Sequence, residues 1–217
     1  MRTWTIGDIT VTSVVEADGT MPGTFLFAEA TPEEVARRHG WACGTFIDDD
    51  GRLLSTVQAL VASSGGKTIV IDTCVGNDKN RDVPAWSQLQ IPFLERFAEA
   101  GFDPLAVDAV VCTHLHVDHV GWNTMLVDGE WHPSFPESRY LFAGPEYLHW
   151  SSEPHRHRPE HDDSIEPVVQ AGLVDLVDVD AEIAPGVTLV IGSHFGGPGS
   201  GRIVSIDDSH IFAAATS

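Results

Sequence analysis

The chain has 217 residues, of which 42% are hydrophobic, and 32 acidic against 12 basic side chains give it a formal net charge of −20. This length and apolar content predict a folded protein with a single domain over residues 1–217, and they exclude a disordered chain. The acidic balance argues against nucleic acid or an anionic membrane as a partner, because both bind through a basic surface.

The cysteine count and the terminal sequence indicate the cellular compartment. Three widely spaced cysteines form no disulfide framework. The first residues lack the apolar core of a signal peptide, and no apolar run reaches the roughly 20 residues of a membrane span. We therefore expect a cytoplasmic protein.

The first third of the chain predicts two hairpins and a short helix. Residues 3–16 alternate in polarity around Gly7-Asp8, which indicates a β-hairpin. Thr31-Pro32-Glu33-Glu34 is a helix start with an N-cap threonine, and the helix should run to Arg38. Residues 53–73 predict a second hairpin whose last strand ends in the polar pair Asp72-Thr73.

The remaining elements alternate between strands and helices, which predicts a mixed α/β fold. A helix interrupted at Pro92 is expected over residues 84–100. The other expected elements are strands at 107–112, 139–143, 187–191, 202–206 and 210–215, helices at 145–150 and 165–171, and an exposed loop at 152–163.

Four strong metal-binding side chains lie within six residues, and they are His114, His116, Asp118 and His119. Buried polar groups need partners, which a metal ion supplies at once, whereas the alternative is a polar surface loop with chance histidines. Imidazole and carboxylate together favour zinc, with iron, manganese, cobalt or nickel also compatible. A turn at Asp118 lets two ligands serve each of two neighbouring ions.

This run, preceded by Thr113 and followed by Gly121, resembles the signature of the metallo-β-lactamase-fold hydrolases. Residues 68–73 and 101–111 resemble the segments that lead to it. The resemblance implies an αββα sandwich, in which two mixed β-sheets carry helices on the outside and the metals lie at one edge. The histidine after Asp118 and the N-terminal hairpin are most similar to the acyl-homoserine lactonase and methyl-parathion-hydrolase-like group.

The resemblance implies a hydrolase with a small-molecule substrate and two metal ions. Metal-bound hydroxide would cleave an ester-like bond of a lactone, ester or phosphotriester. Asp118 would ligate one metal and pass a proton to the leaving group, which makes it the candidate catalytic residue. A glyoxalase II-like thioesterase and a metal-binding protein without turnover are the alternatives, and a homodimer is compatible with the sequence.

The family also has three later ligands, of which the chain matches one. His194, in the glycine-rich segment 192–197, is the candidate fifth metal ligand. Ala214-Ala215 stand where the family has Gly-Asp, and the last family histidine has no counterpart. A truncated chain, a variant with one metal or an altered pair, and a loss of catalysis each explain this. The intact four-ligand run favours a truncated or divergent C-terminus, and truncation would leave the fold C-terminally incomplete.

Several other side chains have two readings. Asp72 either ends a strand or orients a ligand as an outer-shell carboxylate. The histidines at 155, 157 and 161 form a second metal site or, as we expect, a solvated loop. Four aromatic residues line a pocket or, for most of them, pack in the core, and they are Trp122, Phe135, Phe142 and Trp150. Cys112 is expected to act as a small buried hydrophobe rather than a nucleophile.

Overall fold

The computed structural model describes residues 1–39, 43–152, 158–178, 181–188, 201–206 and 209–214, the last two ranges as backbone. The chain forms two compact units, one of Met1–Ala17 with Thr56–Ile191 and one of Asp18–Ser55 with Gly192–Ser217. The single domain stays a prediction. Within the described residues, no helix has the length and apolar character needed to cross a membrane.

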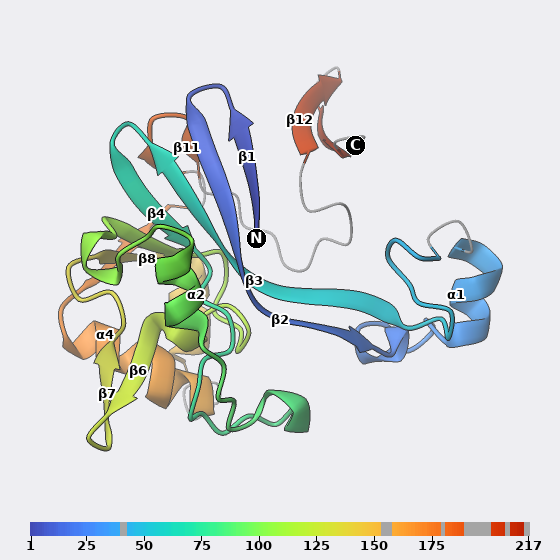
Figure 1. Ribbon diagram of the computed structural model, residues 1–217, viewed down its shortest axis with the longest axis horizontal. Coiled ribbons are helices and arrows are strands. Elements are labelled where there is room, and N and C mark those ends of the chain that lie inside the picture. Colours follow the sequence, from blue (N-terminus) through green and yellow to red (C-terminus); the bar gives the residue numbers. More distant parts are fainter. Residues whose placement is uncertain (40–42, 153–157, 179–180, 189–200, 207–208, 215–217) are drawn as a thin grey trace. The chain divides into compact units, whose positions relative to one another are not determined.

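A seven-stranded mixed sheet is the main element of the fold (Figure 1). Its strands follow the order β1 (Arg2–Ile6), β2 (Ile9–Met21), β3 (Leu53–Ser64), β4 (Lys67–Ile71), β5 (Ala109–Cys112), β8 (Arg139–Ala143) and β9 (Val174–Val177). The hairpins β1–β2 and β3–β4 are antiparallel, whereas β4, β5, β8 and β9 are parallel neighbours. The predicted mixed α/β fold and both N-terminal hairpins are confirmed.

The two faces of the sheet are buried by different layers, as the alternation of side chains along a strand requires. Val61, Val70 and Val110 lie in a cluster with Phe93 and Phe97 of α2 (Phe93–Glu99) and with Val168 of α4 (Glu166–Gln170). The next residues along the same strands pack with Ala184 and Val187 of the small hairpin formed by β10 (Glu182–Ala184) and β11 (Val187–Thr188). Helices therefore cover one face and a second layer of strands lies on the other.

Short elements complete the described part of the first unit. They are the 3-10 turns η3 (Pro84–Trp86), η4 (Pro104–Ala106) and η5 (Gly121–Asn123), the hairpin β6 (Thr124–Val127) and β7 (Glu130–Pro133), helix α3 (Gly144–Trp150) and the π-helix η7 (His161–Ile165).

The second unit contains η1 (Gly23–Phe25), α1 (Pro32–His39) and the antiparallel pair β12 (Gly201–Ile206) and β13 (Ser209–Ala214). The predicted cap of α1 is confirmed, since the backbone N–H of Glu34 donates to Thr31 Oγ1 at 3.3 Å. Glu34 also pairs with Arg37 and Arg38 one turn further along the helix.

Two predicted elements differ from the structure. The helix expected over 84–100 is wrong, because only η3 and α2 are helical and residues 87–92 form a loop. Gln88 has a positive φ of 54°, and Leu89 forms a β-bridge with Asn77, both of which a helix excludes. The loop expected over 152–163 is wrong at its end, where η7 begins at His161, while residues 153–157 lie outside the described range.

Candidate metal centre

The carboxyl ends of three parallel strands place the predicted site at one edge of the sheet. Ile71 pairs with Val111, and Val111 pairs with Leu141, so β4, β5 and β8 end side by side. Asp72 follows β4 directly, Thr113 follows β5 and α3 follows β8. This edge is where ligands bind in open α/β sheets.

Asp72 forms hydrogen bonds with the residue that precedes the histidine run, Thr113, and with its last histidine, His119. Its Oδ1 accepts hydrogen bonds from the backbone N–H of Thr113 at 2.8 Å and from Thr113 Oγ1 at 3.0 Å. Its Oδ2 lies 2.8 Å from Nδ1 of His119. These contacts favour the interpretation that Asp72 orients a ligand over the one in which it merely ends a strand. A carboxylate bound to one ring nitrogen of His119 leaves the other nitrogen for a metal.

The four predicted ligands of the run lie together. The ring centroid of His114 is 4.5 Å from that of His116 and 3.9 Å from that of His119. Asp118 Oδ2 lies 3.4 Å from Nε2 of His119. His114 is 4% exposed, and Thr113 Oγ1 lies 3.2 Å from its Nδ1. The buried His114 ring and the half-buried His119 ring thus each have a polar partner at Nδ1.

The donor set fits a divalent metal in kind, since three imidazoles and a carboxylate are the ligands that zinc and its neighbours take. As placed, no three His, Cys, Asp or Glu side chains within the described ranges have the arrangement of an ion-binding group. His194 and Ala215 lie outside the described residues. The side chains of the run therefore fit a divalent metal in their chemical type and in their proximity to one another.

His119 should make the stability of the metal-free protein depend on pH. Burial lowers its pKa, but hydrogen bonds and charges of Asp118 and Asp72 outweigh burial and raise the pKa to about 9. The unfolded value is about 6.5. The folded protein then holds the proton more tightly, so this stabilisation is complete below about pH 6.5 and is lost as the pH rises through about 9.

Urea unfolding of chelator-treated protein between about pH 6 and pH 10 measures this contribution. The wild type should lose more stability over this interval than His119→Gln, which cannot titrate there. Equal losses in the two proteins would contradict the assignment.

The family assignment follows from the sequence match. The profile of the metallo-beta-lactamase superfamily matches residues 51–214, which include the run and every strand of the sheet from β3 onward. The chain belongs to the metallo-beta-lactamase superfamily. No curated protein sequence matches it significantly.

Solved structures resemble this superfamily member in fold. A probable metal-dependent hydrolase from Staphylococcus aureus aligns with a TM-score of 0.66 at 16% identity, over 85% of this chain and 64% of the other. The hydrolase AbOPH of the beta lactamase superfamily gives a TM-score of 0.63 at 18% identity, over 83% and 62%. AidC, described as a dizinc quorum-quenching lactonase, gives 0.58 at 14% identity, over 84% and 62%. The chain thus spans less than two thirds of each of these proteins.

Helix α3 also contacts the ligand run of this superfamily member, in addition to the contacts that Asp72 makes. Glu146 Oε1 accepts hydrogen bonds from the backbone N–H of Leu115 at 3.0 Å and from Trp150 Nε1 at 2.7 Å. The Trp150 ring meets that of His116 edge to face, with centroids 5.3 Å apart. Glu146 was not predicted as part of the site, because nothing in its local sequence connects it to Leu115.

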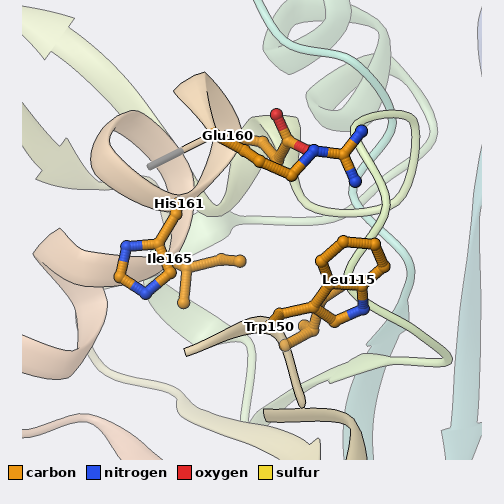
Figure 2. A pocket seen from close by; sticks show the side chains of 6 residues that line it. Leu115, Trp150, Glu160, His161 and Ile165 are labelled. Atoms are coloured by element: carbon orange, nitrogen blue, oxygen red, sulfur yellow. The ribbon is translucent and has the colours of Figure 1, made fainter. Parts of the chain in front are cut away.

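Leu115 and Trp150 also line a small recess beside the run. Figure 2 shows them facing His161 and Ile165, with Glu160 above, and Arg158 also belongs to the lining. The guanidinium lies 4.8 Å from the Trp150 ring centroid, and its Nε is 3.1 Å from Glu160 Oε1. Of the three loop histidines, His161 is the described one, and it lies in this lining.

The other singled-out residues belong to the core. Phe135 and Phe142 are fully buried, and Trp122 is 5% exposed and stacked on Phe93. Cys112 is buried beside Asn123, and burial raises its thiol pKa far above the ordinary value. The predictions of core packing for these residues and of an inert thiol agree with this burial.

A buried charged cluster ties the loop after β4 to η7. Arg81 forms two hydrogen bonds with the Asp163 carboxylate, at 2.7 and 3.0 Å. Lys79 Nζ donates to Thr124 Oγ1 and lies 3.7 Å from the Trp131 ring centroid. Burial lowers the pKa of Lys79 to about 7 against the raising effect of Asp163.

Proposed function

We propose that the chain is a metal-dependent hydrolase that cleaves an ester-like bond of a lactone, ester or phosphotriester. The observation that carries the proposal is the pair of contacts from Asp72 to Thr113 and His119, which orients one of the three imidazoles of the run. Membership of the metallo-beta-lactamase superfamily supports it. The hydrolase and lactonase names of the structural neighbours suggest the bond class.

The proposed metal ligands are His114, His116, Asp118 and His119, with His194 as a fifth from the sequence. Zinc is the metal we propose, as two ions. When bound, it would act as a Lewis acid that polarises the bond to be cleaved and activates water. Asp118 would move a proton to the leaving group, since its Oδ2 lies 3.4 Å from Nε2 of His119, a proposed ligand.

Metal removal and one histidine substitution test the proposal. The purified chain should contain zinc by elemental analysis and should hydrolyse at least one of a panel of lactones, aryl esters, phosphotriesters and thioesters. Chelation should abolish this activity, and added Zn²⁺ should restore it. His116→Ala should lower both metal content and kcat/KM by at least about 10–100-fold.

His132→Ala is the matched control, because His132 is exposed on β7, where it pairs with Met125 of β6, and it is not among the proposed ligands. It should leave both measurements unchanged. Fully metal-loaded protein that hydrolyses nothing on the panel would refute the hydrolase, and turnover of thioesters alone would replace it with a thioesterase. Protein that takes up no metal would favour the reading without turnover.

A further inference from the structure

One buried carboxylate, Glu16 of β2, has no role among the proposed ligands. Glu16 is 2% exposed. It accepts hydrogen bonds from the backbone N–H groups of Val75 at 2.9 Å and Gly76 at 3.0 Å, and from Trp122 Nε1 at 2.7 Å. Burial raises the pKa of Glu16, while these hydrogen bonds and Arg96 oppose the rise. Its three donors come from the two segments that flank the site.

The first of these segments is the loop after β4, and its backbone is strained. Asp72 and Cys74 have positive φ angles of 57° and 55°, a region that residues other than glycine rarely adopt. Gly76 has a φ of 81°. Consecutive N–H groups that converge on one anion form a nest, and here the anion is the Glu16 carboxylate. The carboxylate thus stabilises a conformation that the loop disfavours.

The second segment is the turn after the ligand run, which is joined to the loop backbone to backbone. Thr73 N–H donates to His119 O at 2.8 Å, Gly121 N–H donates to Cys74 O at 2.7 Å, and Trp122 N–H donates to Thr73 O at 2.6 Å. Glu16 therefore accepts hydrogen bonds both from the loop after β4 and from the turn after the ligand run. Arg96 of α2 fixes the strand that carries it, through hydrogen bonds to the carbonyls of Val15 and Glu16.

We propose that Glu16 is a positioning residue for the metal centre, which holds the loop after β4 so that the Asp72 carboxylate meets Nδ1 of His119. The hydrogen-bond donors to Glu16 belong to Val75, Gly76 and Trp122, in the two segments beside the ligands, and Glu16 acts through Asp72. The proposal rests on the proposed function for its metal-binding consequence. Its geometric consequence, the hydrogen bond between Asp72 and His119, is measurable in metal-free protein.

The test is Glu16→Gln, which keeps the size of the side chain but turns one acceptor oxygen into an NH₂ group facing N–H donors. In chelator-treated protein, nitrogen NMR should detect a protected Nδ1 proton on His119 in the wild type, and Glu16→Gln should lose it. Co²⁺ titration followed by visible absorption should show an affinity at least about 10-fold weaker in the variant.

Two further variants separate positioning from stability. Val168→Ala removes buried volume from α4 in the same core, so it should lower the urea midpoint while leaving the His119 signal and Co²⁺ affinity unchanged. Trp122→Phe keeps the ring on Phe93 and removes one donor to Glu16, so it should weaken Co²⁺ binding in the same direction and less strongly. This second variant also tests the proposal if Glu16→Gln does not fold.

The outcomes are distinguishable from failure of the proposed function. A Glu16→Gln protein that behaves like Val168→Ala, with a lower midpoint but an unchanged His119 signal, would overturn the positioning role. If Glu16→Gln does not fold, an unchanged Co²⁺ affinity in Trp122→Phe would do the same. Wild-type protein that binds no Co²⁺ would overturn the proposed function, whereas the proton signal of His119 would still decide the role of Glu16.

Discussion

Asp72→Asn is expected to weaken zinc binding by about 10–100-fold while leaving the fold intact. Asparagine tolerates the positive φ that Asp72 adopts, so the backbone of the loop should not change. The new NH₂ group can only donate. Placed against Nδ1 of His119 it would leave the proton on Nε2, the nitrogen proposed to bind metal, and placed against Thr113 it would leave the backbone N–H unpaired.

Calorimetric titration of metal-free protein with Zn²⁺ measures this effect. Asp108→Asn is the matched control, because Asp108 also accepts a backbone hydrogen bond beside a strand, from Thr68, but lies at the opposite end of β5. It should retain the wild-type affinity. An Asp72→Asn protein that binds zinc as tightly as the wild type would show that the carboxylate does not orient His119.

Gly121→Ala should lose about 4 kcal/mol or more of the free energy of unfolding, a loss at the upper end of single substitutions. A Cβ at Gly121 would lie 1.9 Å from both the carbonyl carbon and oxygen of Val75, and 2.5 Å from the nitrogen of Gly76. These are backbone atoms, and Gly121 is itself hydrogen-bonded to Cys74 O at 2.7 Å. Relief of the contact therefore requires the loop and the turn to separate.

Gly144→Ala provides the comparison for this substitution. Gly144 begins α3, its φ is not in the left-handed region, and a Cβ there would meet only Val177 O at an ordinary 3.8 Å. Its free energy of unfolding in urea should stay within about 0.5 kcal/mol of the wild type. Equal losses in the two alanine variants would mean that the approach of Gly121 to Val75 is not close in the protein.

The ligand run was predictable from sequence because its members are neighbours in the chain. His114 and His119 need no tertiary information to be recognised as candidates, and the strand ends that frame them follow from the apolar runs before Asp72 and Thr113. Glu16 was not predictable in this way. Its partners Val75 and Trp122 come from distant parts of the chain, and no local pattern marks a carboxylate for burial.

The loop between β4 and α2 shows how side-chain bonds override helical periodicity. The Asn77 side chain accepts from the backbone N–H of Ile91 at 2.8 Å and donates to its carbonyl at 2.9 Å, which closes the loop on itself. The hairpin β6–β7 was missed although its turn carries a signal. Asp128-Gly129 have φ angles of 52° and 87°, as Asp-Gly hairpin turns require.

The hydrogen bonds of Asp72 to both Thr113 and His119 have a consequence for protein engineering. A graft of residues 113–121 onto another scaffold would carry the nitrogen donors without the carboxylate that connects Thr113 to His119. A transferable unit therefore needs at least the adjacent parallel strands β4 and β5 with the loop that follows each. A designer who copies only the histidine spacing would obtain imidazoles with independent rotamers, whose ordering would cost binding energy for every ion taken up.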